Sequence, residues 1–414
     1  MSELTYSFRP GRFARERTYR LRADGVEWQD GRRGGSVPYA EVARVEVCKE
    51  RFLGSSASYW RCVLYPKAGR KIRLGAASRS GLRGVEDRTE TYIPFIKELE
   101  ARIATANPRR MMVDGETLLG RIEQGVGRLA VWLLRAIRHT DPDRCADIAA
   151  WVLRRAGPRL RGHRTARSQL MAAFPEKSAA EVELILRGMW DNLARSVVEY
   201  SVLDLLWDHD LVRPRTGGGR IEVDQASIAR WGRVFQDKRP FLGFAAHLAN
   251  WELAAVSMSV HGRQVAIPMR TPRIRALAGE LIRIRTQSGF TPVPSGPDAI
   301  ARIRTAIRGG ALVAMLVDQH QADGIEVAFF GRRCRMNPLF VRLARVFNAQ
   351  IYGGRMIRLP GRRFRYEFVG PIEPVRDAAG RIETAATMQV IASIIEGWIR
   401  EHPEQWMWLH RMWR

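Results

Sequence analysis

Cysteine is scarce in this sequence, and its four copies lie far apart. Cys48, Cys62, Cys145 and Cys334 have none of the paired spacings that zinc sites and disulfide frameworks show. The sequence therefore predicts no metal site and no disulfide bond, and reduced thiols are the expected state.

Long uninterrupted apolar runs are also missing. The first twelve residues contain no apolar core of signal-peptide length, which predicts a protein on the cytoplasmic side of the membrane. Residues 241–260 are apolar enough to suggest a spanning helix, but they contain His247, Asn250 and Glu252. Groups of this kind are costly inside a bilayer, so the sequence favours a strand and a helix in a soluble core.

Acidic residues are few relative to basic ones. The 414 residues include 43 Asp and Glu against 68 Lys and Arg, which gives a formal net charge of +25. Such a charge predicts an anionic partner: nucleic acid, an acidic membrane surface, an acidic carrier protein or a phosphorylated lipid. The composition, with 46% hydrophobic and 27% charged residues, is typical of an ordered globular protein, and the length predicts two domains.

Residues 1–108 predict a small β-rich domain. Short segments rich in β-branched and aromatic residues alternate with glycine-containing turns, and a helix with an apolar face from Tyr92 to Ile103 follows them. The pattern favours a small antiparallel β-barrel closed by a helix, similar in plan to bacterial pleckstrin-homology-like domains. Its basic surface could dock on anionic lipid, or it could be a solvated surface with a structural role. We place the linker at residues 106–110.

Residues 109–414 predict an α/β domain. Strands alternate with helices, which is typical of a mainly parallel sheet covered by helices on both faces. Two buried strands are predicted, one leading to His247 and the other to Asp318. Because ligands bind at the carboxyl ends of such strands, we expect both side chains in one crevice. Earlier in the domain, Ser178 and Glu181 predict a capping box for a long helix.

A helix predicted from Leu118 to Arg138 has two different sides. Arg121, Arg128 and Arg135 recur at heptad spacing opposite a run of leucine, isoleucine and valine. This pattern indicates a helix that lies at an anionic membrane interface. The alternative is an ordinary domain helix whose arginine edge faces solvent.

His247 and Glu252 form the strongest candidate pair for acid–base chemistry. Asn250 is expected to cap a helix that runs from Trp251 to about His261. With His247 in the turn and Glu252 in the first helical turn, the carboxylate can fold back onto one imidazole nitrogen. That contact would fix the tautomer and leave the other nitrogen free to accept a proton from an alcohol.

The residues around this pair resemble a known family. His247-Leu-Ala-Asn-Trp-Glu-Leu is similar to a block of the late acyltransferases of lipid A biosynthesis, the lauroyl and myristoyl transferases, in which a His and an acid separated by four residues form the catalytic pair. Further blocks resemble the same family: Phe174-Pro-Glu with 189–195, 285–289, 317–319, 324–332 and 403–414. Glycerolipid acyltransferases share the His-to-acid spacing, but the Phe-Pro-Glu-Gly-Thr-Arg block that follows it in them is missing here.

This resemblance implies a glycerolipid-acyltransferase-like fold and an acyl-transfer reaction. A fatty acyl group would pass from an acyl carrier protein thioester to a hydroxyl of a lipid A precursor, with no cofactor beyond that thioester co-substrate. His247 would be the general base, and Glu252 would orient it. The substrate alcohol would be the nucleophile, so no Ser or Cys nucleophile is needed.

The resemblance also implies roles for further residues. Arg285 would hold the developing oxyanion or a substrate phosphate, and Asp318 would position the acceptor or a basic partner. Arg270, Asn250 and Gln319 are expected to bind substrate. Without the resemblance, Arg285 is equally consistent with one more charge on a basic helix, and Asp318 with a cap of the next segment.

The expected partners are acyl carrier protein, anionic membrane lipid and a phosphorylated glycolipid. The expected location is the cytoplasmic face of the inner membrane, with peripheral or monotopic attachment. Nucleic acid is not expected, because the sequence contains no recognised nucleic-acid-reading module. Two alternatives stay open: an acyltransferase that acts on a different glycolipid, and a non-catalytic membrane lipid-binding protein.

Overall fold

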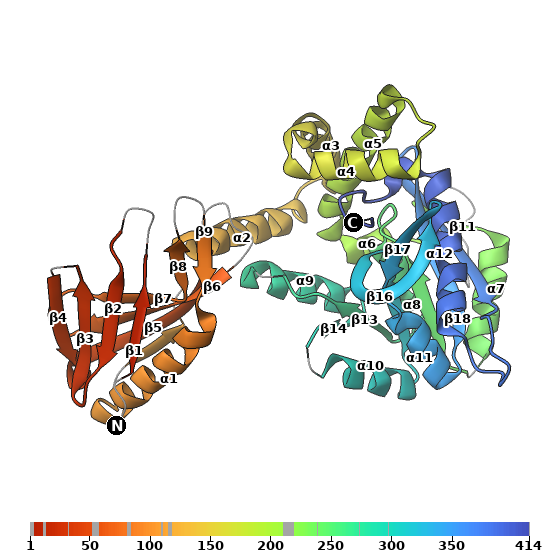
Figure 1. Cartoon of the computed structure of the whole chain (residues 1–414). Coiled ribbons are helices and arrows are strands. Elements are labelled where there is room, and N and C mark those ends of the chain that lie inside the picture. The colour runs from red at the N-terminus through yellow and green to blue at the C-terminus, as the bar shows by residue number, and fades with distance from the viewer. Residues whose placement is uncertain are drawn as a thin grey trace. The chain divides into compact units, whose positions relative to one another are not determined.

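The computed structural model describes the chain except for residues 1–3, 11–13, 32, 52–57, 81–83, 109–110, 115–117, 210–218, 238, 273, 297 and 414. The chain divides into two compact units, residues 1–125 and 126–414, which are drawn in Figure 1. Separate clusters of buried apolar side chains form the cores of the two units.

The first unit consists mainly of antiparallel strands. One sheet has the order β1-β2-β3-β4 and a second has the order β10-β5-β6-β7, while β8 and β9 pair with each other. The bounds are β1 Thr5–Phe8, β2 Arg17–Leu21, β3 Gly25–Asp30, β4 Arg33–Pro38, β5 Val42–Arg51, β6 Ser58–Pro66, β7 Ile72–Gly75, β8 Ala77–Ser80, β9 Gly84–Asp87 and β10 Met111–Asp114. The predicted antiparallel strands are confirmed, and the closed barrel stays a prediction.

Helix α1 (Thr89–Ala106) supplies much of the core of the first unit. Its buried side chains recur every three or four residues, so they form one apolar stripe: Tyr92, Phe95, Ile96, Leu99 and Ile103. They belong to the same apolar cluster as the inward-facing residues of both sheets. The predicted helix is confirmed, with the apolar face that the sequence indicated.

The first unit extends beyond the predicted linker at residues 106–110. Strand β10 pairs in parallel with β5, and its Met111 lies opposite Arg44. The chain therefore returns to the first unit after residue 108, and the division lies after residue 125. Residues 111–114 read Met-Met-Val-Asp and lack the alternation of apolar and polar residues that marks a half-buried strand, so the sequence shows no sign of a strand after the predicted linker.

The second unit contains a seven-stranded sheet with the order β11-β19-β18-β12-β15-β13-β14. Every neighbouring pair is parallel except β18 and β19, so the predicted mainly parallel α/β sheet is confirmed. The bounds are β11 Ile221–Val223, β12 Phe241–Ala245, β13 Val265–Met269, β14 Phe290–Pro294, β15 Leu312–Leu316, β18 Gln350–Leu359 and β19 Arg363–Ile372, with a separate hairpin of β16 His320–Phe329 and β17 Arg332–Met336.

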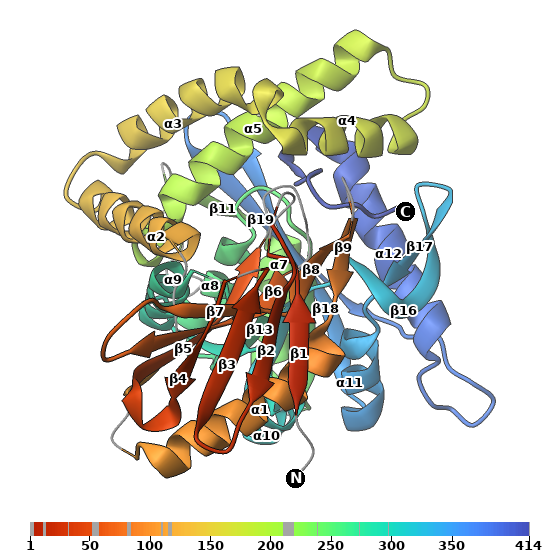
Figure 2. The same cartoon turned by 60° about the vertical axis from the view of Figure 1, so that its left-hand side comes forward.

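Helices cover both faces of this sheet (Figures 1 and 2). Helices α10, α11 and α12 share one apolar cluster with the sheet, and α7, α8 and α9 share the other. The helix bounds after α1 are α2 Leu118–Ile137, which spans the division between the units, α3 Pro142–Ala156, α4 Arg161–Ala173, α5 Ala179–Tyr200, α6 Leu203–Leu206, α7 Gln225–Gln236, α8 Glu252–Val260, α9 Arg275–Gln287, α10 Ala299–Arg308, α11 Leu339–Phe347 and α12 Thr384–Glu401. Side chains alternate along β12: Phe244 belongs to the cluster that includes α11 and α12, and Phe241 to the cluster that includes α8. This alternation is the pattern expected of a strand buried on both faces.

Helix α5 begins at the capping box that the sequence predicted. The Ser178 side chain accepts a hydrogen bond from the backbone N–H of Glu181 at 3.3 Å, and the Glu181 side chain accepts one from the backbone N–H of Ser178 at 2.8 Å. Figure 2 shows α5 packed with α3 and α4. The cap therefore fixes the start of α5 at Ala179.

Among the helices of the described residues, we find none whose length and apolar character would let it cross a bilayer.

Candidate active site

Two neighbouring parallel strands bring His247 and Asp318 together. β12 and β15 pair in register, with Ala245 opposite Leu316, so the residues that follow them emerge at the same edge of the sheet. The Nδ1 atom of His247 lies 2.8 Å from Oδ1 of Asp318, and the backbone N–H of His247 donates to Oδ2 at 2.7 Å. The predicted crevice at the carboxyl edge therefore contains both side chains.

The carboxylate of Asp318 is buried, with 1% exposure, and is surrounded by donors. Besides the two contacts with His247, it accepts a hydrogen bond from the indole N–H of Trp406 at 2.7 Å. Burial acts to raise the pKa of Asp318, but the charge and hydrogen bonds of His247 and the bond from Trp406 outweigh it, and the pKa is lowered. Asp318 is thus an ionised acceptor, which assigns the Nδ1 proton to His247 and leaves its Nε2 as the basic nitrogen.

Glu252 does not contact His247 in the predicted way. It is the first residue of α8 and is buried, and its carboxylate binds the guanidinium of Arg285 on α9, with contacts of 2.5 Å to Nη2 and 3.2 Å to Nε. The prediction that Glu252 orients the imidazole is therefore wrong. Asp318 occupies Nδ1 of His247, and a two-point contact with Arg285 satisfies both oxygens of a carboxylate that would otherwise be buried without a counter-charge.

The Arg285 guanidinium is also largely withdrawn from solvent, with a side-chain exposure of 13%. Burial acts to lower the pKa of Arg285, but the neighbouring carboxylate of Glu252 outweighs this effect and raises it. Arg285 therefore remains a fixed positive charge. Its remaining N–H groups include one that points at the sulfur of Met269, at 3.2 Å.

A cavity of about 690 Å³ opens beside these groups. Its polar wall contains five of the seven predicted site residues: His247, Glu252, Arg270, Arg285 and Gln319. Asp318 is not among the described residues that line the cavity, and it contacts His247, which does line it. Arg270 follows β13 and is exposed.

The rest of the cavity wall is largely apolar and comes from both faces of the sheet. On the α8 face, small residues leave room between helix and sheet: Gly243, Ala245, Ala254, Ala314 and Gly354. A Cβ added at Gly243 would lie 3.6 Å from the nearest side chain, that of Leu312. The cavity can therefore enclose a hydrocarbon chain next to the polar groups.

Asn250 was predicted to cap a helix and to bind substrate, and the structure places it in neither position. Helix α8 begins after Trp251, which makes no side-chain cap, so the predicted Asn250 cap is wrong. The Asn250 amide instead donates to Glu199 at 3.0 Å. Asn250 is 2% exposed and is not among the described residues that line the cavity, so it lies behind the predicted substrate site.

Two residues of the chain's last block belong to the site, and the sequence reasoning did not assign them. Trp406 contacts Asp318, as described above, and His410 lines the cavity. The side-chain nitrogen of Gln319 lies 2.9 Å from Nε2 of His410 and 3.3 Å from Nε2 of His247. Burial and the charges of His247 and Arg270 lower the pKa of His410, with Asp318 acting against them. The sequence signal that could have identified Trp406 and His410 is their position in the block at 403–414, which resembles the family.

One comparison with known proteins finds a relationship. The model of a family described as bacterial lipid A biosynthesis acyltransferase matches residues 122–414. The match covers more than two thirds of the chain and includes every residue of the site above. No curated protein matches the chain.

Proposed function

The chain belongs to the bacterial lipid A biosynthesis acyltransferase family, and from that premise we propose that it transfers a fatty acyl group from an acyl carrier protein thioester to a hydroxyl of a lipid A precursor. The observation that carries this proposal is the His247–Asp318 pair beside a cavity with a mainly apolar wall. An alcohol, a thioester and a long acyl chain are the three elements that such a site accommodates.

His247 is the general base of the proposed reaction. Its Nε2 takes the proton of the acceptor hydroxyl while the hydroxyl oxygen attacks the thioester carbonyl carbon. The tetrahedral intermediate then collapses, the carbon–sulfur bond breaks, and the imidazolium returns the proton to the leaving sulfur. Asp318 holds the ring and stabilises the imidazolium, which is the part assigned to the acid in such pairs.

Arg285 provides positive charge for the oxyanion of the intermediate or for a substrate phosphate. Each terminal nitrogen of a guanidinium carries two N–H groups, so the contacts with Glu252 and Met269 leave donors for a ligand. Glu252 contributes by orienting Arg285. This arrangement replaces the direct contact between Glu252 and His247 that the sequence suggested.

Substrate recognition combines charge with apolar contact. We assign Arg270 and Gln319, which line the cavity, to the polar groups of the substrates. The formal net charge of +25 favours an acidic carrier protein and a phosphorylated acceptor, because both would be attracted to a basic surface.

Attachment to the cytoplasmic face of the inner membrane is proposed through α2. Among the α2 side chains that the structure describes, the large apolar ones that face solvent are Val126, Leu129, Trp132 and Leu133. Arg128 is exposed on the same helix, whereas Arg135 binds Glu280 at 2.7 Å, and the Arg121 side chain lies outside the part of the chain that the structure describes. Exposed apolar residues beside basic ones suit an anionic bilayer surface. We further propose that the β-rich first unit is a pleckstrin-homology-like barrel that binds anionic lipid.

The test is mass spectrometry of lipid extracts from cells with and without the protein. A mass difference of one acyl chain on a phosphorylated glucosamine lipid, absent in His247→Ala cells, is the expected result. The same difference on another glycolipid would change the acceptor and keep the chemistry. Vesicle binding without any acylated product would instead support the non-catalytic lipid-binding alternative.

A further inference from the structure

The turn that carries His247 has an unusual backbone. It runs from Ala246 to Asn250 between β12 and α8, and Ala249 has a φ of 47°. Residues with a Cβ rarely adopt this left-handed conformation because the Cβ crowds the following carbonyl. Such a conformation persists only where the surrounding structure holds it.

The first support of the turn is the segment that follows α12. Ala249 donates its backbone N–H to the carbonyl of Gln405 at 3.0 Å, and the backbone N–H of Met407 donates to the carbonyl of His247 at 3.1 Å. Between these bonds Leu248 forms an antiparallel bridge with Trp406. The turn is therefore paired to this segment as one strand is paired to its neighbour.

The second support is helix α5. The carbonyl of Ala249 accepts hydrogen bonds from the Ser196 hydroxyl at 3.0 Å and from the Asn192 amide at 3.4 Å. The next residue, Asn250, donates to Glu199 at 3.0 Å. These α5 side chains are one helical turn apart, so they form a row along the turn.

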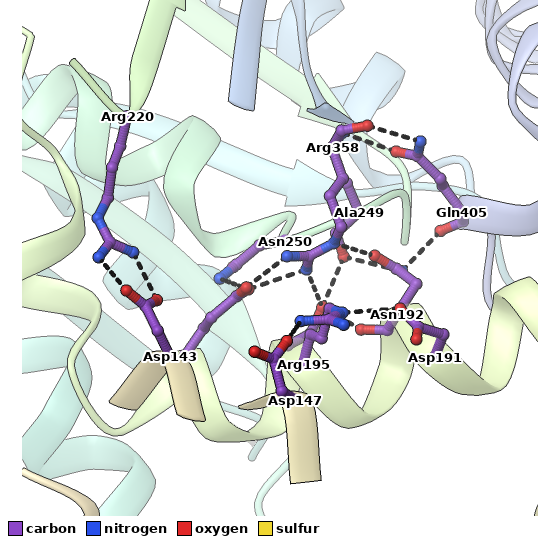
Figure 3. A network of polar contacts seen from close by, with 12 residues as sticks. Asp143, Asp147, Asp191, Asn192, Arg195, Arg220, Ala249, Asn250, Arg358 and Gln405 are labelled. Carbon is purple, nitrogen blue, oxygen red and sulfur yellow. Dashed lines mark hydrogen bonds and ion pairs between the residues drawn. The ribbon is translucent and has the colours of Figure 1, made fainter. Parts of the chain in front are cut away.

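Arg358 of β18 binds all three of these α5 side chains, and Figure 3 shows it beside Asn192, Ala249 and Gln405. Its Nε donates to Asn192 at 2.8 Å, and its Nη2 donates to Ser196 at 3.2 Å and to Glu199 at 2.9 Å. Its Nη1 forms a second contact with Glu199. The guanidinium and the carboxylate are 13% and 12% exposed, so they are a largely buried ion pair.

Arg358 also joins the two supports to each other. Its backbone N–H donates to the Gln405 side chain at 2.8 Å, and the Gln405 amide donates to the Arg358 carbonyl at 3.0 Å. The Gln405 carbonyl meanwhile accepts from both Ala249 and Asn192. A single connected network thus holds the turn, while neither Arg358 nor Glu199 is among the described residues that line the cavity.

We infer that Arg358 and Glu199 are positioning residues for acyl transfer. They act through the turn at residues 246–250, which holds His247 in contact with Asp318. The effect on rate rests on the proposed function, whereas the effect on the imidazole does not. Loss of either partner leaves a buried charge without its counter-charge and removes donors or acceptors from the row. The turn then relaxes, and the Nδ1–H group of His247 loses its fixed distance to Asp318.

The chain offers a matched control in the same β18–β19 hairpin. Arg363 binds Glu222, but both side chains are more exposed, at 49% and 36%. Within the described part of the chain, neither forms a hydrogen bond with residues 246–250. The test set is therefore Arg358→Met, Arg358→Lys and Glu199→Gln against Arg363→Met and Glu222→Gln. All are made in the full chain and checked for native folding by circular dichroism.

Two measurements test whether Arg358 and Glu199 position His247. The first is the downfield proton resonance of the His247 Nδ1–H group, identified by its loss in His247→Ala. The second is acyl transfer from acyl carrier protein thioester, with kcat and KM determined separately. We expect Arg358→Met and Glu199→Gln to shift or broaden the resonance and to lower kcat by about 10- to 100-fold with little change in KM, since small misplacements of a base have effects of this size.

Arg358→Lys should restore part of both signals, and the two control variants should match the wild type. Folded Arg358→Met and Glu199→Gln proteins with the wild-type resonance and kcat would overturn the inference. If Arg358→Met does not fold, Arg358→Lys and Glu199→Gln decide by the same criteria. If the wild-type protein transfers no acyl group, the proposed function fails, and the resonance alone still decides whether the network positions His247.

Discussion

Two pairs of ionisable side chains, His247–Asp318 and Arg285–Glu252, lie at the cavity, and they differ in the chemistry that they permit. In the His247–Asp318 pair, the buried carboxylate holds the proton of one imidazole nitrogen and leaves the other nitrogen as the proton acceptor. In the Arg285–Glu252 pair, the guanidinium keeps its protons at every accessible pH. The first pair is suited to proton transfer and the second to charge stabilisation. The partner of a residue therefore reveals its chemistry better than its presence in the cavity.

Removal of the base tests the His247–Asp318 pair directly. His247→Ala should lower kcat by about 10³- to 10⁴-fold, near the upper range for loss of a general base, with native circular dichroism. The assay is acyl transfer from acyl carrier protein thioester. A folded variant with near-native rates would assign the proton transfer to another group.

The carboxylate of the same pair can be changed with little change in shape. Asp318→Asn replaces an acceptor by an amide that can donate to Nδ1, which favours the tautomer with its proton on Nε2. We expect a loss in kcat of about 10²- to 10³-fold. An equal loss in Asp318→Asn and Glu252→Gln, with the same dependence on pH, would remove the distinction between the two pairs.

The second pair is tested by keeping its charge and changing its geometry. Arg285→Lys retains one positive charge but cannot form the two-point contact with Glu252. We expect kcat/KM to fall by about 10- to 100-fold, less than the roughly 10²- to 10³-fold for complete loss of an oxyanion donor, because one positive charge is kept. The pH profile should not shift. A shift in the pH profile would indicate that Arg285 acts on the base itself.

For His410 we expect a smaller effect, on the pH dependence of stability. Its pKa is lowered, so the folded protein disfavours its protonation, and stability falls as pH drops below the unfolded-state value of about 6.5. The loss stops growing once pH is below the folded-state pKa. His410→Asn should therefore unfold at a midpoint in urea that changes less between pH 7 and pH 5 than that of the wild type. Equal changes in the two proteins would contradict the assigned direction.

Local signals in the sequence predicted local structure well. The Ser178–Glu181 capping box is confirmed because both of its bonds join residues three apart. The sheet and the shared edge for His247 and Asp318 are confirmed because apolar runs determine buried strands and parallel strands end together.

The errors concern partners that are distant in sequence. Glu252 lies five residues from His247, yet its partner is Arg285. Asn250 has the residue type of a cap, but its amide binds Glu199. These choices depend on the order of strands and on which helix packs beside the turn, and neither is encoded in a short pattern.

The connection between Asp318 and Trp406 has a consequence for how the protein acquires activity. A ribosome releases residues 405–410 long after the strands that carry His247 and Asp318, yet these later residues pair with the His247 turn, bind the Asp318 carboxylate and supply His410. A nascent chain whose sheet has folded still lacks the residues that hold His247 and Asp318 in place. Competence to transfer acyl groups therefore requires a segment that is synthesised after every strand of the seven-stranded sheet.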